Sequence, residues 1–144
     1  MAEKHEFGSP GWFDALRRAI ERIAREGGPD VDQVRWSVCE VFVDVPPHLA
    51  QTPVGKAAWH CRIRGREVAF GLGEIEDADL KVVADYATAL PLSRTLLADP
   101  EAQARVNQTL MEAVMAGKMQ IKGSLDARPP AFAGLHDAMV AVTA

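Results

Sequence analysis

Four β-strand patterns follow one another between residues 35 and 84, separated only by turns and loops. The first, over residues 35–45 (RWSVCEVFVDV), is rich in β-branched and aromatic residues, and both of its faces carry apolar side chains that we expect to be covered. Residues 57–72 alternate apolar and polar side chains about a central Arg-Gly pair, which predicts a hairpin. Residues 78–84 predict a fourth strand. A run of strands set apart from the helices is typical of the α+β class.

Helix patterns lie on both sides of these strands. Residues 10–26 combine a helical apolar stripe with a serine that can cap the start and a glycine after the end. Residues 100–116 have the same signals, with Asp99 as the cap. Between them, residues 85–98 predict short helical turns that break before Pro91, because the residue preceding a proline is pushed out of the helical region.

A fifth strand pattern follows the long helix directly. Residues 117–125 (GKMQIKGSL) alternate in polarity, so one face of this strand should point inward and the other toward water. The linker at 126–130 contains two prolines, and residues 131–142 predict a final amphipathic helix. The sequence therefore predicts five strands and several helices that cover them.

Length and composition favour an ordinary globular protein. We expect a single domain over residues 1–144, with residues 1–8 disordered. A net charge of −4 argues against a nucleic-acid partner. Cys39 and Cys61 fit no disulfide framework and are interpreted as small core residues. Without a signal peptide or a long apolar run, the expected location is the cytoplasm, and the alanine and arginine content is typical of a GC-rich bacterial source.

No pattern in the sequence indicates catalysis, a metal site or a cofactor. Ser93, His136 and Asp137 could supply a nucleophilic triad, but the G-x-S-x-G motif is missing. His60 and Cys61 are neighbours on a strand, so they point to opposite faces and cannot share a metal ion. We therefore expect no catalytic residue, no metal and no cofactor.

Two charged clusters lie near the hairpin. Acidic residues between 74 and 79 lack the spacing of a calcium loop and are interpreted as a solvated turn. Arg62, Arg64 and Arg66 gather around the hairpin turn, where they would keep it soluble. The alternative role for these arginines is a transient contact with an anionic membrane surface.

The fifth strand and its surroundings resemble the sterol carrier protein type 2 family. In that family a helix is followed by G-K-[LM]-x-[IV]-x-G and then by an apolar helix, and Gly117, Lys118, Met119, Ile121 and Gly123 occupy those places. The segment DADLKVVADYATAL at 77–90 is similar to the acidic turn, strand and short helix of the family. This chain departs from the family in the double proline of the linker, and its loop at 46–55 is long.

The resemblance implies a fold and a function. The fold is a twisted, five-stranded, largely antiparallel sheet covered by helices, with an apolar tunnel or cavity between them. The function is lipid binding or lipid transfer without catalysis, for a hydrophobic ligand such as a fatty acid, acyl-CoA or sterol-like molecule. The final helix would act as a lid. The residues expected to form the walls are Trp59, Phe70, Leu96, Leu110, Met111, Val114, Met119, Ile121, Phe132, Leu135 and Met139.

Two other functions stay open. An enzyme could use the same pocket, with His60, Glu40 or Asp85 as the acid or base, and a titratable group inside the pocket would favour this alternative. An interaction module, including a homodimer, would instead have a filled core and an exposed apolar patch.

Overall fold

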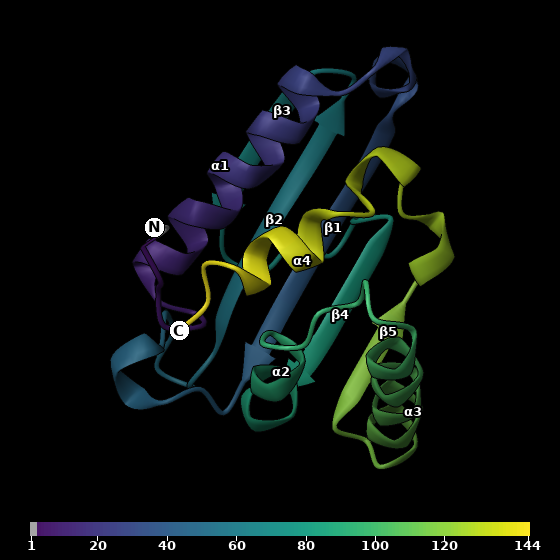
Figure 1. Cartoon of the computed structure of the whole chain (residues 1–144). Helices are drawn as coiled ribbons and strands as arrows, with labels where there is room; N and C mark the ends of the chain where they lie inside the picture. Colours follow the sequence, from purple (N-terminus) through teal and green to yellow (C-terminus); the bar gives the residue numbers. More distant parts are fainter. Residues whose placement is uncertain (1–2) are drawn as a thin grey trace.

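Five strands form one mixed sheet in the order β3-β2-β1-β4-β5 in the computed structural model, which describes residues 3–144 (Figure 1). The β1–β2, β2–β3 and β4–β5 pairs are antiparallel, whereas β1 and β4 are parallel. The predicted α+β class and the five-stranded, largely antiparallel sheet are therefore confirmed. The strands are β1 (Arg35–Val43), β2 (Ala57–Arg64), β3 (Glu67–Leu72), β4 (Leu80–Asp85) and β5 (Met119–Lys122).

Four α-helices accompany the sheet over the described residues. They are α1 (Pro10–Glu26), α2 (Tyr86–Leu92), α3 (Pro100–Met115) and α4 (Leu135–Val140). In Figure 1, α1 lies along β2 and β3, α4 crosses the middle of the sheet, and α3 lies beside β5. The Ser9 side chain caps α1 and the Asp99 side chain caps α3, as predicted. Short 3₁₀ turns cover Pro29–Gln33, Pro47–Leu49, Leu125–Ala127 and Pro130–Phe132.

Both faces of the central strand β1 are covered, as its apolar residues on both sides predicted. Trp36, Val38 and Phe42 belong to the main core beneath the helices. Cys39 and Val41 face the opposite side, where the segment between β3 and β4 packs over them. That segment crosses the sheet from its β3 edge to β4, and this crossover places β4 parallel to β1.

Two helical segments differ from their predictions. Helix α2 runs through Pro91 instead of breaking before it. The proline is the second-last residue of this short helix, so its missing N–H removes at most one intrahelical hydrogen bond. The last helix is shorter than predicted, because a 3₁₀ turn and Gly134 separate Phe132 from α4.

The N-terminal segment packs against the core, so the prediction of disorder is wrong for residues 3–8. Phe7 is buried. Its ring contacts the rings of Trp12 and Phe42 edge-on, with centroids 4.9 Å apart in each pair, and it stacks on Tyr86 with centroids 5.3 Å apart. The His5 N–H also donates to the Val142 carbonyl at 2.7 Å. One aromatic residue in a polar segment leaves no periodic signal, so the sequence did not indicate that this segment packs against the core. Residues 1 and 2 lie outside the described residues.

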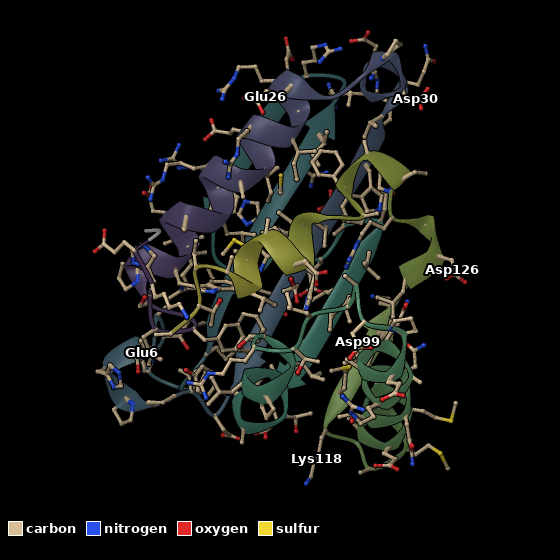
Figure 2. All side chains as sticks on the ribbon, viewed as in Figure 1. Glu6, Glu26, Asp30, Asp99, Lys118 and Asp126 are labelled. Atoms are coloured by element: carbon tan, nitrogen blue, oxygen red, sulfur yellow. The ribbon has the colours of Figure 1, made fainter. Side chains whose placement is uncertain are left out.

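Charged side chains lie mainly at the periphery of the molecule. Figure 2 shows Glu6, Glu26 and Asp126 extending outward from the body of the fold. Of the described helices, none is long and apolar enough to cross a membrane.

Candidate ligand-binding cavity

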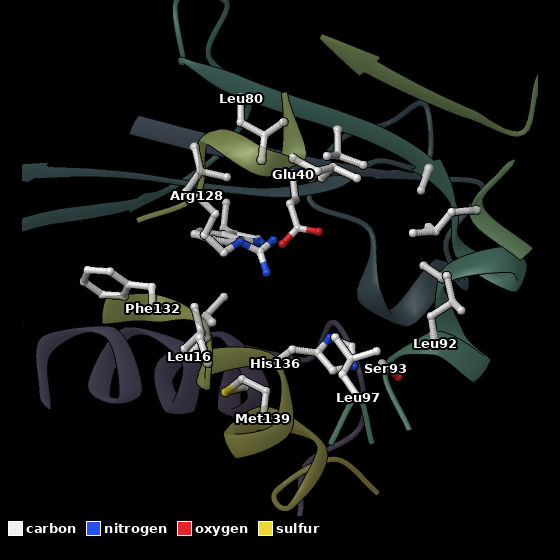
Figure 3. Close-up of a pocket in the computed structure, with 18 of the residues that line it drawn as sticks. Leu16, Glu40, Leu80, Leu92, Ser93, Leu97, Arg128, Phe132, His136 and Met139 are labelled. Atoms are coloured by element: carbon white, nitrogen blue, oxygen red, sulfur yellow. The ribbon is translucent and has the colours of Figure 1, made fainter. Parts of the chain in front are cut away.

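A cavity of about 310 Å³ lies between the helix-covered face of the sheet and the helices (Figure 3). Alternate residues of the inner strands form its floor, because side chains two apart on a strand share one face. The four helices contribute the remaining wall together with Phe7, the segment between α2 and α3 and the segment before α4, and this wall is mostly apolar. Its main apolar residues are Leu16, Ile20, Trp36, Val38, Phe42, Trp59, Leu80, Val82, Val106, Leu110, Met119, Ile121, Phe132, Leu135 and Met139.

Most of the predicted wall residues surround this cavity. Those that line it are Trp59, Leu110, Met119, Ile121, Phe132, Leu135 and Met139. They come from β2, β5, α3 and the C-terminal region, which are far apart in the sequence. The structure therefore brings the predicted sheet and helix residues to one place, and their role in binding stays a prediction.

Four predicted wall residues lie elsewhere. Phe70 stacks on Trp59 with ring centroids 5.7 Å apart, but it does not reach the cavity. Leu96, Met111 and Val114 are 51%, 65% and 43% exposed. Helix α3 buries a different side, which includes Ala102, Val106 and Ala113. Its apolar residues are spread around much of its circumference, so periodicity could not identify the side that meets β5.

The sequence prediction missed the contribution of α1 and β1 to the wall. Leu16 and Ile20 of α1 and Trp36 of β1 line the cavity. Their apolar pattern was recognised, but it could not distinguish a residue facing a cavity from one packed in a filled core.

Glu40 is the only carboxylate among the described residues that line the cavity. It follows Trp36 and Val38 on the same face of β1, and no described residue forms a hydrogen bond or ion pair with its side chain. Burial raises the pKa of Glu40, while the positive charge of Arg128 and the nearby Trp59 indole partly oppose this effect. In Figure 3 the Arg128 guanidinium extends toward the Glu40 carboxylate.

Two of the three tryptophans have unsatisfied indole groups. The N–H groups of Trp36 and Trp59 are buried without a hydrogen-bond partner among the described residues, and both side chains line the cavity. The indole N–H of Trp12 instead donates to Thr143 Oγ1 at 3.0 Å. Buried N–H groups normally find a partner, so the two unsatisfied indoles need an explanation.

The other two candidate acids or bases lie away from the cavity. His60 is on the opposite face of β2, where its Nδ1 lies 2.9 Å from the Gly73 carbonyl oxygen. Asp85 precedes α2 and accepts a hydrogen bond of 3.4 Å from the Thr88 hydroxyl. Of the predicted catalytic alternatives, only Glu40 reaches the cavity.

Ser93, His136 and Asp137 do not form a triad. The Ser93 hydroxyl donates to the Leu90 carbonyl at 2.6 Å, and His136 Nε2 lies 2.9 Å from the Thr95 carbonyl oxygen. The Asp137 carboxylate accepts hydrogen bonds from the backbone N–H groups of residues 97 and 98 at 2.7 and 3.0 Å. His136 and Asp137 thus fasten α4 to the segment between α2 and α3.

The arginines near the hairpin have different environments. Arg66 donates to carbonyl groups at the end of α1, including those of Ala24 and Gly27 at 3.1 and 3.0 Å. Arg62 pairs with Asp77 at 2.7 Å, while Arg64 is exposed. Arg66 therefore stabilises the end of a helix, and the three residues do not form one free basic surface.

The acidic cluster is more than a solvated turn. Glu74 and Glu76 bind the ammonium group of buried Lys81 at 2.6 and 3.0 Å. Lys81 pairs with Cys39 in the sheet register, on the face opposite the cavity. Over residues 3–144, no group of three or more histidine, cysteine, aspartate or glutamate side chains could hold a metal ion.

Comparison with solved structures shows the fold. The chain is similar to TT1886 of Thermus thermophilus, described as possibly a sterol carrier protein, with a TM-score of 0.51 and 17% identity over 99% of this chain and 92% of that one. It is also similar to the UbiJ-SCP2 ubiquinone synthesis protein, with a TM-score of 0.47 and 15% identity over 90% and 96%. A third similar structure is palmitated SCP2L2 of Aedes aegypti, with a TM-score of 0.43 and 16% identity over 88% of this chain and 92% of that one. No family profile and no curated protein sequence matches the chain. The first similarity shows the sterol carrier protein fold.

Proposed function

We propose that this chain, which has the fold of a sterol carrier protein domain, binds a hydrophobic small molecule or lipid and carries it without catalysis. The observation that carries this proposal is the cavity of about 310 Å³, whose wall is mostly apolar. Its volume is at the lower end of the range for small-molecule sites, roughly 300–1,000 Å³. The proposed setting is the cytoplasm, and the net charge of −4 argues against a nucleic-acid partner.

The hydrophobic effect would supply enough affinity for such a ligand. Burying one methylene contributes about 0.8 kcal/mol, so ten would contribute roughly 8 kcal/mol before the cost of ordering the ligand.

Native mass spectrometry of the freshly purified protein, followed by extraction under denaturing conditions, tests the proposal. We expect about one hydrophobic molecule per chain. Leu110→Trp should reduce its retention, because Leu110 lines the cavity. Met111→Trp is the matched control, since the neighbouring Met111 is 65% exposed. A protein that purifies empty and gains no mass with acyl chains, alkyl alcohols or sterols would contradict the carrier function.

Glu40 is the residue that could serve as the acid or base if this cavity were the active site of an enzyme. A half-buried carboxylate with a raised pKa is suited to proton transfer. However, the described wall has no activated nucleophile beside it, because the Ser93 hydroxyl and the His136 Nε2 atom bond to backbone carbonyls. Incubation with the extracted ligand distinguishes the two functions: a carrier returns the ligand unchanged, whereas an enzyme converts it.

An apolar patch on α3 supports a second type of interaction. Met111, Val114 and Met115 are exposed on neighbouring turns of this helix. The patch fits a homodimer contact or a transient membrane contact during ligand transfer. Sedimentation equilibrium tests the dimer, and Met115→Glu should abolish any self-association that depends on this patch.

A further inference from the structure

Two polar groups of the cavity wall without partners are neighbours on the sheet. Glu40 and Trp59 are paired residues of β1 and β2, so their side chains leave the same face side by side. The Trp59 indole N–H is buried without a hydrogen-bond partner among residues 3–144. Arg128 reaches toward Glu40 from the segment before α4, as Figure 3 shows. One part of the cavity wall therefore contains a donor, an acceptor and a cation.

These groups do not satisfy one another. Glu40 and Arg128 do not come within the 4.0 Å of an ion pair. The Trp59 indole lies close enough to Glu40 to lower the pKa of its carboxyl group, but the two groups do not meet the geometry of a hydrogen bond. Burying the Trp59 N–H without a partner is costly. The half-buried Glu40 carboxylate loses part of its hydration without gaining a protein partner, which is also unfavourable. A polar ligand group placed between them would provide the missing partners.

The chemistry of the three groups defines that ligand group. Trp59 and Arg128 can only donate hydrogen bonds, whereas an ionised Glu40 can only accept them. A hydroxyl group both accepts and donates, so it can bond with both sides at once. A carboxylate would be attracted by Arg128 but repelled by Glu40, and an ammonium group would be attracted by Glu40 but repelled by Arg128, so the opposite charges cancel much of the attraction for either charged group.

We propose that Glu40, Trp59 and Arg128 form a head-group site that selects neutral, hydroxyl-bearing amphiphiles over fatty acids and alkylamines. This proposal rests on the proposed carrier function and adds the class of ligand. The hydroxyl group binds between the sheet and Arg128, and the apolar part of the ligand occupies the remainder of the cavity. Burial of Glu40, which raises its pKa, is consistent with a carboxylate that lacks partners without the ligand.

Calorimetric titration with decanol, decanoate and decylamine tests this selectivity at about pH 8, where free carboxyl groups are ionised and most alkylamine is charged. Delipidated protein should bind decanol about tenfold or more tightly than either charged probe, a difference of ~1.4 kcal/mol. The three probes have the same alkyl chain, so the head group alone accounts for any difference. Equal affinities, or tighter binding of decanoate, would overturn the proposal.

Removing each charge should change the selectivity in a defined direction. Glu40→Gln leaves Arg128 as the only charge, so decanoate should become the preferred probe. Arg128→Gln leaves Glu40, so decylamine should become preferred. Glu67→Gln and Arg64→Gln are matched controls at exposed positions outside the cavity, and they should keep the wild-type order. An unchanged order in both cavity variants would show that water satisfies these groups, and would overturn the proposal.

The indole N–H signals provide a test that needs no charge variant. In a ¹H–¹⁵N spectrum, decanol should shift the Trp59 signal strongly, because this group gains an acceptor. Trp12 is the internal control, since its N–H already donates to Thr143. Trp59→Phe assigns the signal and should weaken decanol binding.

Failure of the head-group site can be distinguished from failure of the carrier function. If decanol binds without shifting Trp59, the cavity takes ligands but the proposed site is wrong. If none of the three probes binds, the head-group proposal fails as well, and the mass of the co-purified ligand then decides the carrier function separately.

Discussion

Trp12 Nε1 donates a hydrogen bond of 3.0 Å to Thr143 Oγ1, and this bond joins the first helix to the segment that follows the last one. Thr143 also donates to the Met139 carbonyl at 2.6 Å. Asp137 binds the backbone before α3, so both ends of α4 are held. Opening α4 as a lid would therefore require these bonds to break. Truncation after Ser124 would be a poor test of the lid, because it removes the fully buried Phe132.

Thr143→Val should destabilise the protein by about 1–3 kcal/mol, because it leaves the buried Trp12 indole without an acceptor. Urea denaturation measures the change in the free energy of unfolding. Thr109→Val is the control, since Thr109 is exposed on α3 and should change stability by less than about 0.5 kcal/mol. Equal effects of the two variants would show that the Trp12–Thr143 bond contributes nothing.

Glu40→Gln should stabilise the ligand-free protein at neutral pH. The pKa of Glu40 is raised above its ordinary value of 4.5, so between these two values the folded state binds more protons than the unfolded state. The free energy of unfolding therefore falls as the pH rises through this window. Each pKa unit by which the folded state exceeds the unfolded state costs about 1.4 kcal/mol of stability.

The difference in Tm between Glu40→Gln and the wild type should be small at about pH 4 and lower, and should grow with pH until the folded pKa is passed. Thermal unfolding over a pH series measures it. Glu67→Gln, at an exposed position, should show no comparable trend. A Glu40→Gln effect that is the same at every pH would contradict the raised pKa of this half-buried carboxylate.

The two glycines around β5 should respond differently to alanine. Gly117 has a φ of +75° and open space beyond its Cα, so Gly117→Ala should cost about 1–2 kcal/mol from the backbone conformation alone. Gly123 has a φ of +96°, and a Cβ atom there would overlap the Asp79 carbonyl oxygen. Gly123→Ala should therefore cost more than about 3 kcal/mol. Urea denaturation compares them, and equal losses would show that the close approach to Asp79 is unimportant.

Both cysteines should be unreactive in the folded protein. Burial raises the pKa of Cys61 to about 12 and also raises that of Cys39, and neither side chain is exposed. At about pH 8 few thiolates would form, and the reagent could not reach them. Titration with a thiol-reactive dye should detect almost no thiol in buffer and two per chain in guanidinium, since the sequence has two cysteines. Rapid labelling in buffer would reveal local opening of β1 or β2.

Local sequence determined the elements of this fold with few exceptions. The caps at Ser9 and Asp99, the hairpin and the alternation in β5 each depend on neighbouring residues, so the patterns identified them. Pro91 was an exception, because it lies in the last turn of α2, where its missing N–H removes at most one intrahelical hydrogen bond. The family resemblance of the motif at 117–123 predicted that the strands form one sheet with a binding site between it and the helices. Periodicity alone could not predict this arrangement.

Only the tertiary structure decided which apolar residues share the cavity and what polar groups join them. Met111 and Leu110 are neighbours of the same apolar character, yet one is exposed and the other lines the cavity, because the position of α3 beside β5 determines which side is buried. Likewise, Glu40 and Arg128 are far apart in the sequence, and they come near each other only because the C-terminal segment packs over the sheet. The sequence by itself determined the strands, the helices and an apolar interior. Which side chains meet inside depends on long-range packing, and local patterns carry no information about it.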